Sequence, residues 1–277
     1  LTSFDTDGFS IGNQAAANQL GEDFVAWNWK ANSIPTINTD GTIQSLVSAN
    51  QASGFSIVKL TGTGSAATIG HGLSAVPEMI IVKHLNGAND WWVYNKDLNG
   101  GTNPASYFLK LNTSDAEILN GSGSVFQGTS PTSSVFYGGT AITDTGREMI
   151  AYCFTSISGF SKIGSYTGNG SATGPIVTTG FQPDFVMIKS SSLAGTAWII
   201  FDSARSPSNP RQLLLQPQSA AAEQNVGNAI DFNADNFQLT DTNDSRNGSG
   251  QTYIYMAFKE NPTPYPAAGN MSFLVIA

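Results

Sequence analysis

Charged side chains are scarce in this chain of 277 residues, because Asp, Glu, Lys and Arg together make up only 12% of it. An ordinary globular protein carries about twice that share. The hydrophobic share of 40% is near normal, so the chain can bury a core and is not disordered by composition. Glycine, serine, threonine and asparagine replace the missing charge. They suit short strands and turns and are poor or mediocre helix formers.

Basic residues are especially few, with twelve Lys and Arg against twenty Asp and Glu, and they form no cluster. A nucleic-acid-binding protein needs a basic stripe to displace counterions, and an anionic lipid surface attracts the same kind of stripe. No apolar run approaches the roughly 20 residues that cross a bilayer. We therefore expect neither a nucleic-acid partner nor insertion into a membrane.

The chain has one cysteine, Cys153, and two histidines, His71 and His84. One cysteine excludes an internal disulfide and a Cys-x-x-Cys site, and three such residues in all exclude a conventional structural zinc site. We interpret Cys153 as a small buried strand residue rather than a nucleophile. His71 is expected in a turn, and His84 is expected on the surface at the end of a strand.

The sequence contains two tandem repeats offset by about 106 residues. The matching segments, in chain order, are 54–57 with 159–162, 61–65 with 167–171, 77–83 with 183–189, and 149–154 with 253–258. Because order, spacing and residue type all agree, we predict repeat A over 54–158 and repeat B over 159–261, each with its own core.

A partial third copy opens the chain, since residues 3–11 match 231–239 and residues 24–30 match 253–259. We expect residues 1–31 to be the terminal strands of a truncated repeat, and the chain to be the C-terminal part of a longer protein. The alternative is an independent hairpin that docks on repeat A. Residues 32–53 are then a connector with one extended piece.

Residues 262–277 form a Pro-rich tail that ends in the apolar stretch 271–277. A free apolar strand at a chain end would be prone to aggregate. We expect this one to add to a sheet edge, in this chain or in a neighbouring subunit.

Strand and turn signals dominate both repeats. Turn formers such as Asn-Gly recur every 8 to 12 residues, and the apolar runs 78–83 and 184–189 suit strands that are covered on both faces or lie in a sandwich core. The short segment 218–225 is the one helical candidate. The pattern predicts an all-β fold of tandem antiparallel β-sandwich modules, similar to a jelly roll.

No catalytic motif stands out in the sequence, which has no Gly-x-Ser-x-Gly, no His-Glu-x-x-His and no phosphate-binding loop. We therefore expect no enzyme. Asp5 with Asp7, and Asp241 with Asp244, are candidate calcium ligands, although the Asp-Gly and Asp-Asn steps also fit turn chemistry and no complete calcium-binding loop is present. No other cofactor is expected.

Tryptophan gives one candidate ligand site. Trp92 and Trp198 correspond at the 106-residue offset and are expected in the core. Trp91 then lies opposite Ala197, and its side chain points to the other face of the strand. If a tryptophan stacks on sugar rings at the surface, Trp91 is the one we expect to do so.

The same stretches resemble repeats of tail-fibre-like proteins of marine bacteriophages. The stretches that carry this resemblance are 54–65, 70–73, 77–83, 92–94, 129–136, 150–154, 159–171 and 252–258. In that family the domain has no known function and often follows another sandwich domain in a longer virion protein, and the resemblance implies no catalytic residues. The tail from Pro262 departs from the usual short ending.

The resemblance implies a non-enzymatic structural or adhesion protein on the surface of a virion, as a tail fibre or a capsid-attached fibre. The expected partners are other virion proteins, further copies of the chain in a homo-oligomer, and host surface glycans. One alternative is a polysaccharide depolymerase, which needs two converging carboxylates. The other is an architectural capsid decoration or spacer that binds no ligand.

Overall fold

A computed structural model gives the fold, and it describes residues 1–5, 8–32 and 34–260. Strands form nearly all of the regular structure, which confirms the prediction of an all-β sandwich fold. In the described residues the helical elements are α1 (Ala15–Asn18) and two short 3-10 turns, Leu98–Gly101 and Pro104–Ser106. The predicted tail strand at 271–277 lies outside these residues.

Each repeat contributes one main antiparallel sheet. In repeat A the strand order is β10 (Ile118–Leu119), β9 (Tyr107–Lys110), β8 (Trp92–Asn95), β7 (Met79–His84), β12 (Glu148–Phe154), β5 (Phe55–Thr61), β4 (Ser45–Asn50) and β3 (Thr36–Asn38). In repeat B it is β13 (Ser161–Thr167), β20 (Thr252–Phe258), β15 (Phe185–Ser190) and β16 (Ile199–Asp202). The order β5-β12-β7-β8 in repeat A therefore matches β13-β20-β15-β16 in repeat B.

A smaller sheet accompanies each main sheet. In repeat A it pairs β11 (Val135–Gly138) with β6 (Ala67–Gly70), and in repeat B its order is β14 (Ile176–Thr178), β19 (Asn236–Leu239), β18 (Gln224–Asn233) and β17 (Arg211–Leu214). At the start of the chain β1 (Ser3–Phe4) and β2 (Phe9–Ser10) pair only with each other. No helix in the described parts of the chain is long and apolar enough to span a membrane.

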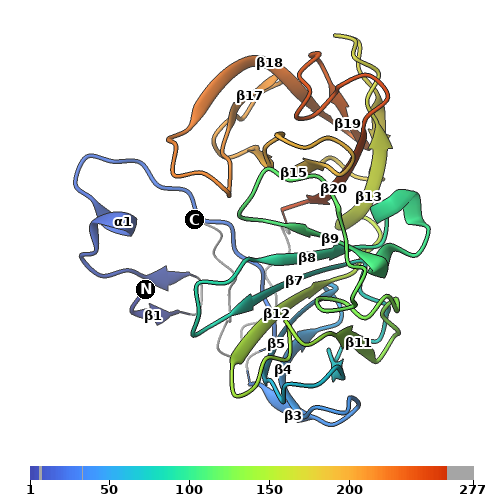
Figure 1. Cartoon of the computed structure of the whole chain (residues 1–277). Helices are drawn as coiled ribbons and strands as arrows, with labels where there is room; N and C mark the ends of the chain where they lie inside the picture. Colours follow the sequence, from blue (N-terminus) through green and yellow to red (C-terminus); the bar gives the residue numbers. More distant parts are fainter. Residues whose placement is uncertain (6–7, 33, 261–277) are drawn as a thin grey trace.

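The two main sheets pack against each other through one apolar cluster, which we call the shared core (Figure 1). Two further clusters fill the space between each main sheet and its smaller partner. Along β7, Met79 and Ile81 face the shared core, whereas Ile80 and Val82 face the core of repeat A. Both faces of β7 and β15 are thus buried, which explains their continuous apolar sequences and confirms that expectation.

The register of the strands corrects the pairing of the tryptophans. Val82 pairs with Trp92 in repeat A and Ile188 pairs with Ile199 in repeat B, so Trp198 corresponds to Trp91. Trp92 and Trp198 are both buried, as predicted, but Trp92 lies in the core of repeat A and Trp198 in the shared core. The connection before β16 is one residue longer than that before β8, and a shift of one residue exchanges the two faces of a strand.

The N-terminal segment and the connector differ in part from the expectation. β1 and β2 pair in the register of their predicted counterparts in β18 and β19. Residues 24–30, which match β20 in sequence, form no strand, because the described chain before them offers no counterparts of the strands that flank β20. Residues 32–53 supply two strands, β3 and β4, which extend the main sheet of repeat A.

The helix predicted at 218–225 is wrong. The hydroxyl of Ser219 accepts a hydrogen bond from the backbone N–H of Ala221 at 3.1 Å, which holds a turn. Gln224 and Asn225 pair with β17 as part of β18. Alanine favours a helix only weakly, and the pairing of β18 prevails.

Both histidines are buried, so the surface position predicted for His84 is wrong. Nε2 of His84 lies 2.9 Å from the carbonyl O of Ala141. Nδ1 of His71 accepts the N–H of Leu73 at 3.1 Å, and burial lowers the pKa of this side chain. Cys153 is buried in β12, as expected. Burial raises the pKa of its thiol to about 12, which leaves it inert as a nucleophile.

Lys189 is fully buried on β15, where its ammonium donates hydrogen bonds to the carbonyl O of Ser190 at 2.9 Å and to Oγ1 of Thr196 at 3.0 Å. Burial lowers its pKa to about 8, and the carboxylate of Asp115 opposes this shift only in part. The unfolded chain keeps this lysine protonated up to its ordinary pKa of 10.5. Between these two values the unfolded state therefore binds more protons than the folded state.

We expect Lys189 by itself to raise the free energy of unfolding by about 1–3 kcal/mol from pH 8 to pH 10. Cys153 opposes this rise above pH 9, because burial raises its pKa from 9.0 to about 12. Above pH 10 the free energy of unfolding should fall again, because burial raises the pKa of Tyr94, Tyr152 and Tyr255 to about 12. Urea denaturation at stepped pH measures the slope. Lys189→Met should flatten the rise, and Lys83→Met, at the matching half-buried position of repeat A, is the control. A rise that persists in Lys189→Met contradicts this assignment.

Candidate functional site

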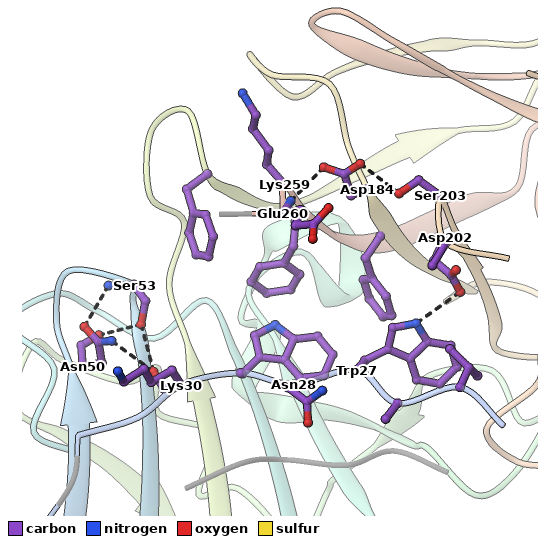
Figure 2. Close-up of a pocket in the computed structure, with 17 residues that line it drawn as sticks. Trp27, Asn28, Lys30, Asn50, Ser53, Asp184, Asp202, Ser203, Lys259 and Glu260 are labelled. Carbon is purple, nitrogen blue, oxygen red and sulfur yellow. Dashed lines mark hydrogen bonds between the residues drawn. The ribbon is translucent and has the colours of Figure 1, made fainter. Parts of the chain in front are cut away.

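A cavity of about 380 Å³ lies where the N-terminal segment meets the two repeats (Figure 2). We call it the junction pocket. One wall is the segment 25–30, a second is the turn that carries Asn50 and Ser53, and a third is the end of the main sheet of repeat B. The lining residues from repeat B are Phe160, Asp184, Phe185, 202–204 and 258–260.

Aromatic side chains form the floor of the junction pocket. Trp29, Phe185 and Phe258 are buried and meet edge to face, with Trp29 5.3 Å from Phe185 and 5.4 Å from Phe258 between ring centroids. Two half-buried rings flank this floor, Trp27 at 5.7 Å from Phe185 and Phe160 at 6.1 Å from Phe258. The pocket is therefore built on the packed edge of the shared core.

Hydrogen bonds hold the segment 25–30 in place without a strand ladder. The carbonyl O of Lys30 accepts hydrogen bonds from Nδ2 of Asn50 at 3.1 Å and from Oγ of Ser53 at 3.4 Å. At the other end, Nε1 of Trp27 donates to Asp202 at 3.1 Å, a bond drawn in Figure 2. The alternate residues Trp27 and Trp29 both face the shared core, as in an extended chain.

Asp202 is a structural carboxylate. Its Oδ1 accepts the backbone N–H of Arg205 at 2.9 Å, and its Oδ2 accepts Nε of Arg205 at 2.6 Å as well as the indole N–H of Trp27. The guanidinium carbon of Arg205 also lies 5.6 Å from the ring of Trp27. Trp27 is thus fixed at its N–H and along its ring.

Asp184 also accepts hydrogen bonds from the protein. It accepts Oγ–H of Ser203 at 2.9 Å and the backbone N–H of Glu260 at 2.8 Å, which ties the end of β20 to the start of β15. Glycoside hydrolysis requires one carboxylic acid that can donate a proton and a second carboxylate that is free to act on the sugar or on water. Since Asp184 and Asp202 both bind groups of the protein, the pocket is better suited to binding than to hydrolysis.

The charges around the junction pocket balance. Its lining includes three carboxylates, and three cations stand against them: two lysines in the lining and Arg205, which pairs with Asp202. The carboxylates are Asp184, Asp202 and Glu260, and the lysines are Lys30 and Lys259. Figure 2 shows the side chain of Lys259 directed away from the other labelled groups. Arg205 also pairs with Glu223 at 2.9 Å, so the pocket has no excess of positive charge that would select an anionic ligand.

The residue chosen from the sequence as a sugar platform, Trp91, lies outside the junction pocket. It is half-buried and packs against the shared core, and its backbone N–H donates to Oδ1 of Asn112 at 2.9 Å. Trp198, at the corresponding position of repeat B, is 1% exposed. Because Trp91 packs against the shared core, less of its ring is exposed than we expected from its alternation with Trp92.

The candidate calcium ligands are spread over two places. Asp5 is exposed and accepts the hydroxyls of Ser3 and Ser10 at 3.0 and 2.8 Å, and Asp7 lies outside the described residues. The carboxylate of Asp241 is paired with Arg246, and the backbone O of Asp244 accepts the hydroxyl of Tyr253 at 2.6 Å. In the described part of the chain no three His, Cys, Asp or Glu side chains gather in a way that could hold a metal ion.

Sequence reasoning missed Trp27 and Trp29 as residues of a pocket. It placed them on a terminal strand, because residues 24–30 match β20. The usable signal was that no preceding segment matched the strands beside β20. A strand-like segment without neighbours has to bury its large side chains elsewhere, and this one does so at the junction of the repeats.

A family model described as a domain of unknown function (DUF7483) matches residues 1–262. The match includes the N-terminal segment, the connector and both repeats. No curated protein and no solved structure matches the chain.

Proposed function

The chain belongs to the DUF7483 family of domains of unknown function, and from that premise we propose a non-enzymatic structural and adhesion role on the surface of a bacteriophage particle, in contact with host glycans. The observation that carries the adhesion role is the junction pocket. It offers half-buried aromatic rings beside two carboxylates, Asp184 and Asp202, that are already bound by the protein. Such a lining supports binding without bond cleavage.

The packing of the two repeats supports a structural role. The shared core joins their main sheets face to face, so the repeats form one stacked block rather than two separate modules on a linker. The backbone N–H of Glu117 donates to the carbonyl O of Ser191 at 2.8 Å, and that of Gly195 donates to Ser114 at 2.8 Å, both between the repeats. A stiff block can present a binding site at a fixed place, and several copies would raise avidity.

The assignment to a virion rests on the resemblance to tail-fibre-like repeats of marine bacteriophages. Under this proposal the partners are other virion proteins, further copies of the chain and host surface glycans. A polysaccharide depolymerase is the enzymatic alternative, and a spacer or capsid decoration without a ligand is the architectural one. Asp184 and Asp202 already accept hydrogen bonds from the protein, which disfavours the depolymerase. The presence of the junction pocket disfavours the spacer without a ligand.

The labelled protein is expected to stay on host cells and on their extracted surface polysaccharide, and to release no oligosaccharide. Pull-down on immobilised polysaccharide measures retention, and chromatography of the supernatant measures release. An inert β-sandwich protein of similar size and net charge is the control. Release of oligosaccharide would support the depolymerase instead. Absence of both retention and release would leave the architectural role.

A further inference from the structure

The junction pocket has the size of a ligand site. Its volume of about 380 Å³ lies within the range of roughly 300–1,000 Å³ that is usual for small-molecule pockets. Three distant parts of the chain form it: the segment 25–30, the turn after β4 and the end of the main sheet of repeat B. A ligand there would contact all three parts at once.

Two of its five aromatic rings keep partly exposed surface that a ligand can contact. Trp29, Phe185 and Phe258 are spent on packing with one another, with exposed fractions of 6–7%. Trp27 and Phe160 are half-buried and come from different elements, so they flank the floor from two sides. Aromatic rings in this position suit the apolar C–H faces of a sugar ring, whose hydroxyls then reach the polar rim.

The electrostatics of the junction pocket select against ions. A cationic ligand would have to compete with Arg205 for Asp202, which already accepts three hydrogen bonds. Glu260 is exposed, so water would screen its attraction for a cation. An anionic ligand would face Asp184 and Glu260, which also line the pocket. An ion that loses its water on binding needs a well-placed counter-charge to compensate. A neutral polyhydroxylated ligand therefore fits the pocket best.

We infer that the junction pocket binds an uncharged pyranose unit of a glycan, with Trp27 and Phe160 as the flanking contacts. This inference rests on the proposed function and makes it specific, because it names the site and the class of sugar. It also replaces Trp91 by Trp27 as the tryptophan that contacts the sugar.

The test is a saturation-transfer NMR titration of the full chain with neutral, acidic and basic sugars. The neutral probes are methyl glucoside, methyl galactoside and chitotriose, and the charged probes are glucuronic acid and glucosamine. Trp27→Ala and Phe160→Ala should each weaken binding of the neutral probe by at least about tenfold. Trp91→Ala removes a half-buried tryptophan outside the pocket and should leave the affinity unchanged. Near-UV circular dichroism checks the fold of each variant, and Phe160→Ala decides the test if Trp27→Ala fails to fold.

The outcomes separate this inference from the proposed function. Neutral-sugar binding that is lost in both pocket variants and kept in Trp91→Ala supports the site. Binding that survives both pocket variants overturns the site but leaves the adhesion role intact. Binding of only glucuronic acid or only glucosamine overturns the class of sugar. If the wild-type chain binds none of these probes yet is retained on host polysaccharide, the pocket inference fails alone, whereas loss of retention as well removes the proposed function.

Discussion

Trp198→Ala is expected to lower the free energy of unfolding by about 3–5 kcal/mol, the range for deleting a large buried aromatic side chain. Trp198 is 1% exposed and lies in the shared core. Its Nε1 donates to the backbone O of Lys110 at 2.9 Å, so the substitution also leaves a carbonyl of repeat A without this partner. Urea denaturation followed by tryptophan fluorescence and by far-UV circular dichroism measures the loss.

The matched control for this substitution is Trp91→Ala. Trp91 occupies the corresponding position of repeat A, but it is only half-buried against the same core. Trp91→Ala should lower the free energy of unfolding by about 1–2 kcal/mol, because it removes less buried apolar surface. Equal losses for the two variants would contradict the unequal burial of this pair.

Trp198→Ala also tests whether the two repeats unfold together. The shared core couples them in the wild type, so one cooperative transition is expected. A cavity at this position weakens the contact between the main sheets more than the core of either repeat. The variant should therefore show a broader unfolding transition or two separate transitions. A single sharp transition with its midpoint at a lower urea concentration would indicate that other contacts hold the two repeats together.

Arg246→Met is expected to lower the free energy of unfolding by about 3–5 kcal/mol, because it leaves a largely buried carboxylate without its cation. The side chain of Arg246 is 4% exposed and that of Asp241 is 20% exposed, and both Nε and Nη2 of the arginine bind this carboxylate. The guanidinium carbon also lies 6.0 Å from the ring of Phe201. Methionine keeps much of the apolar volume, so the loss measures mainly the charge.

Repeat A supplies a matched control in the corresponding loop before β12. Arg147 and Asp144 form an ion pair at 3.5 Å, with side chains 47% and 52% exposed. Arg147→Met should cost less than about 1 kcal/mol, because water already screens this pair. Thermal and urea unfolding of both variants give the comparison, and similar losses would contradict the role of burial.

The same pair of variants tests calcium at Asp241. In the wild type Arg246 occupies this carboxylate, so millimolar calcium should not change the midpoint of unfolding. If Asp241 is instead a calcium ligand, calcium would stabilise the wild type and restore much of the stability of Arg246→Met. Isothermal titration with calcium chloride provides a second readout of the same question.

The sequence by itself determined the fold class. Frequent Asn-Gly turns and few helix formers left strands as the regular element, and the apolar runs along β7 and β15 indicated strands that are buried on both faces or lie in a sandwich core. These are local properties, because turn preference and the alternation of side chains depend on neighbours along the chain. The repeat at a 106-residue offset predicted two tandem modules, and the structure gives each of them a main sheet with the same strand order.

The tertiary structure alone decided which faces meet and where the pocket lies. One additional residue before β16 moved Trp198 into the shared core, and residues 24–30 join no strand ladder in the described part of the chain. His84 became buried for the same kind of reason, since a loop of repeat A covers it. The junction pocket joins segments more than a hundred residues apart, and its chemistry depends on Asp184 and Asp202 being bound by the protein. Such contacts arise only when distant strands pack, so no local pattern in the sequence records them.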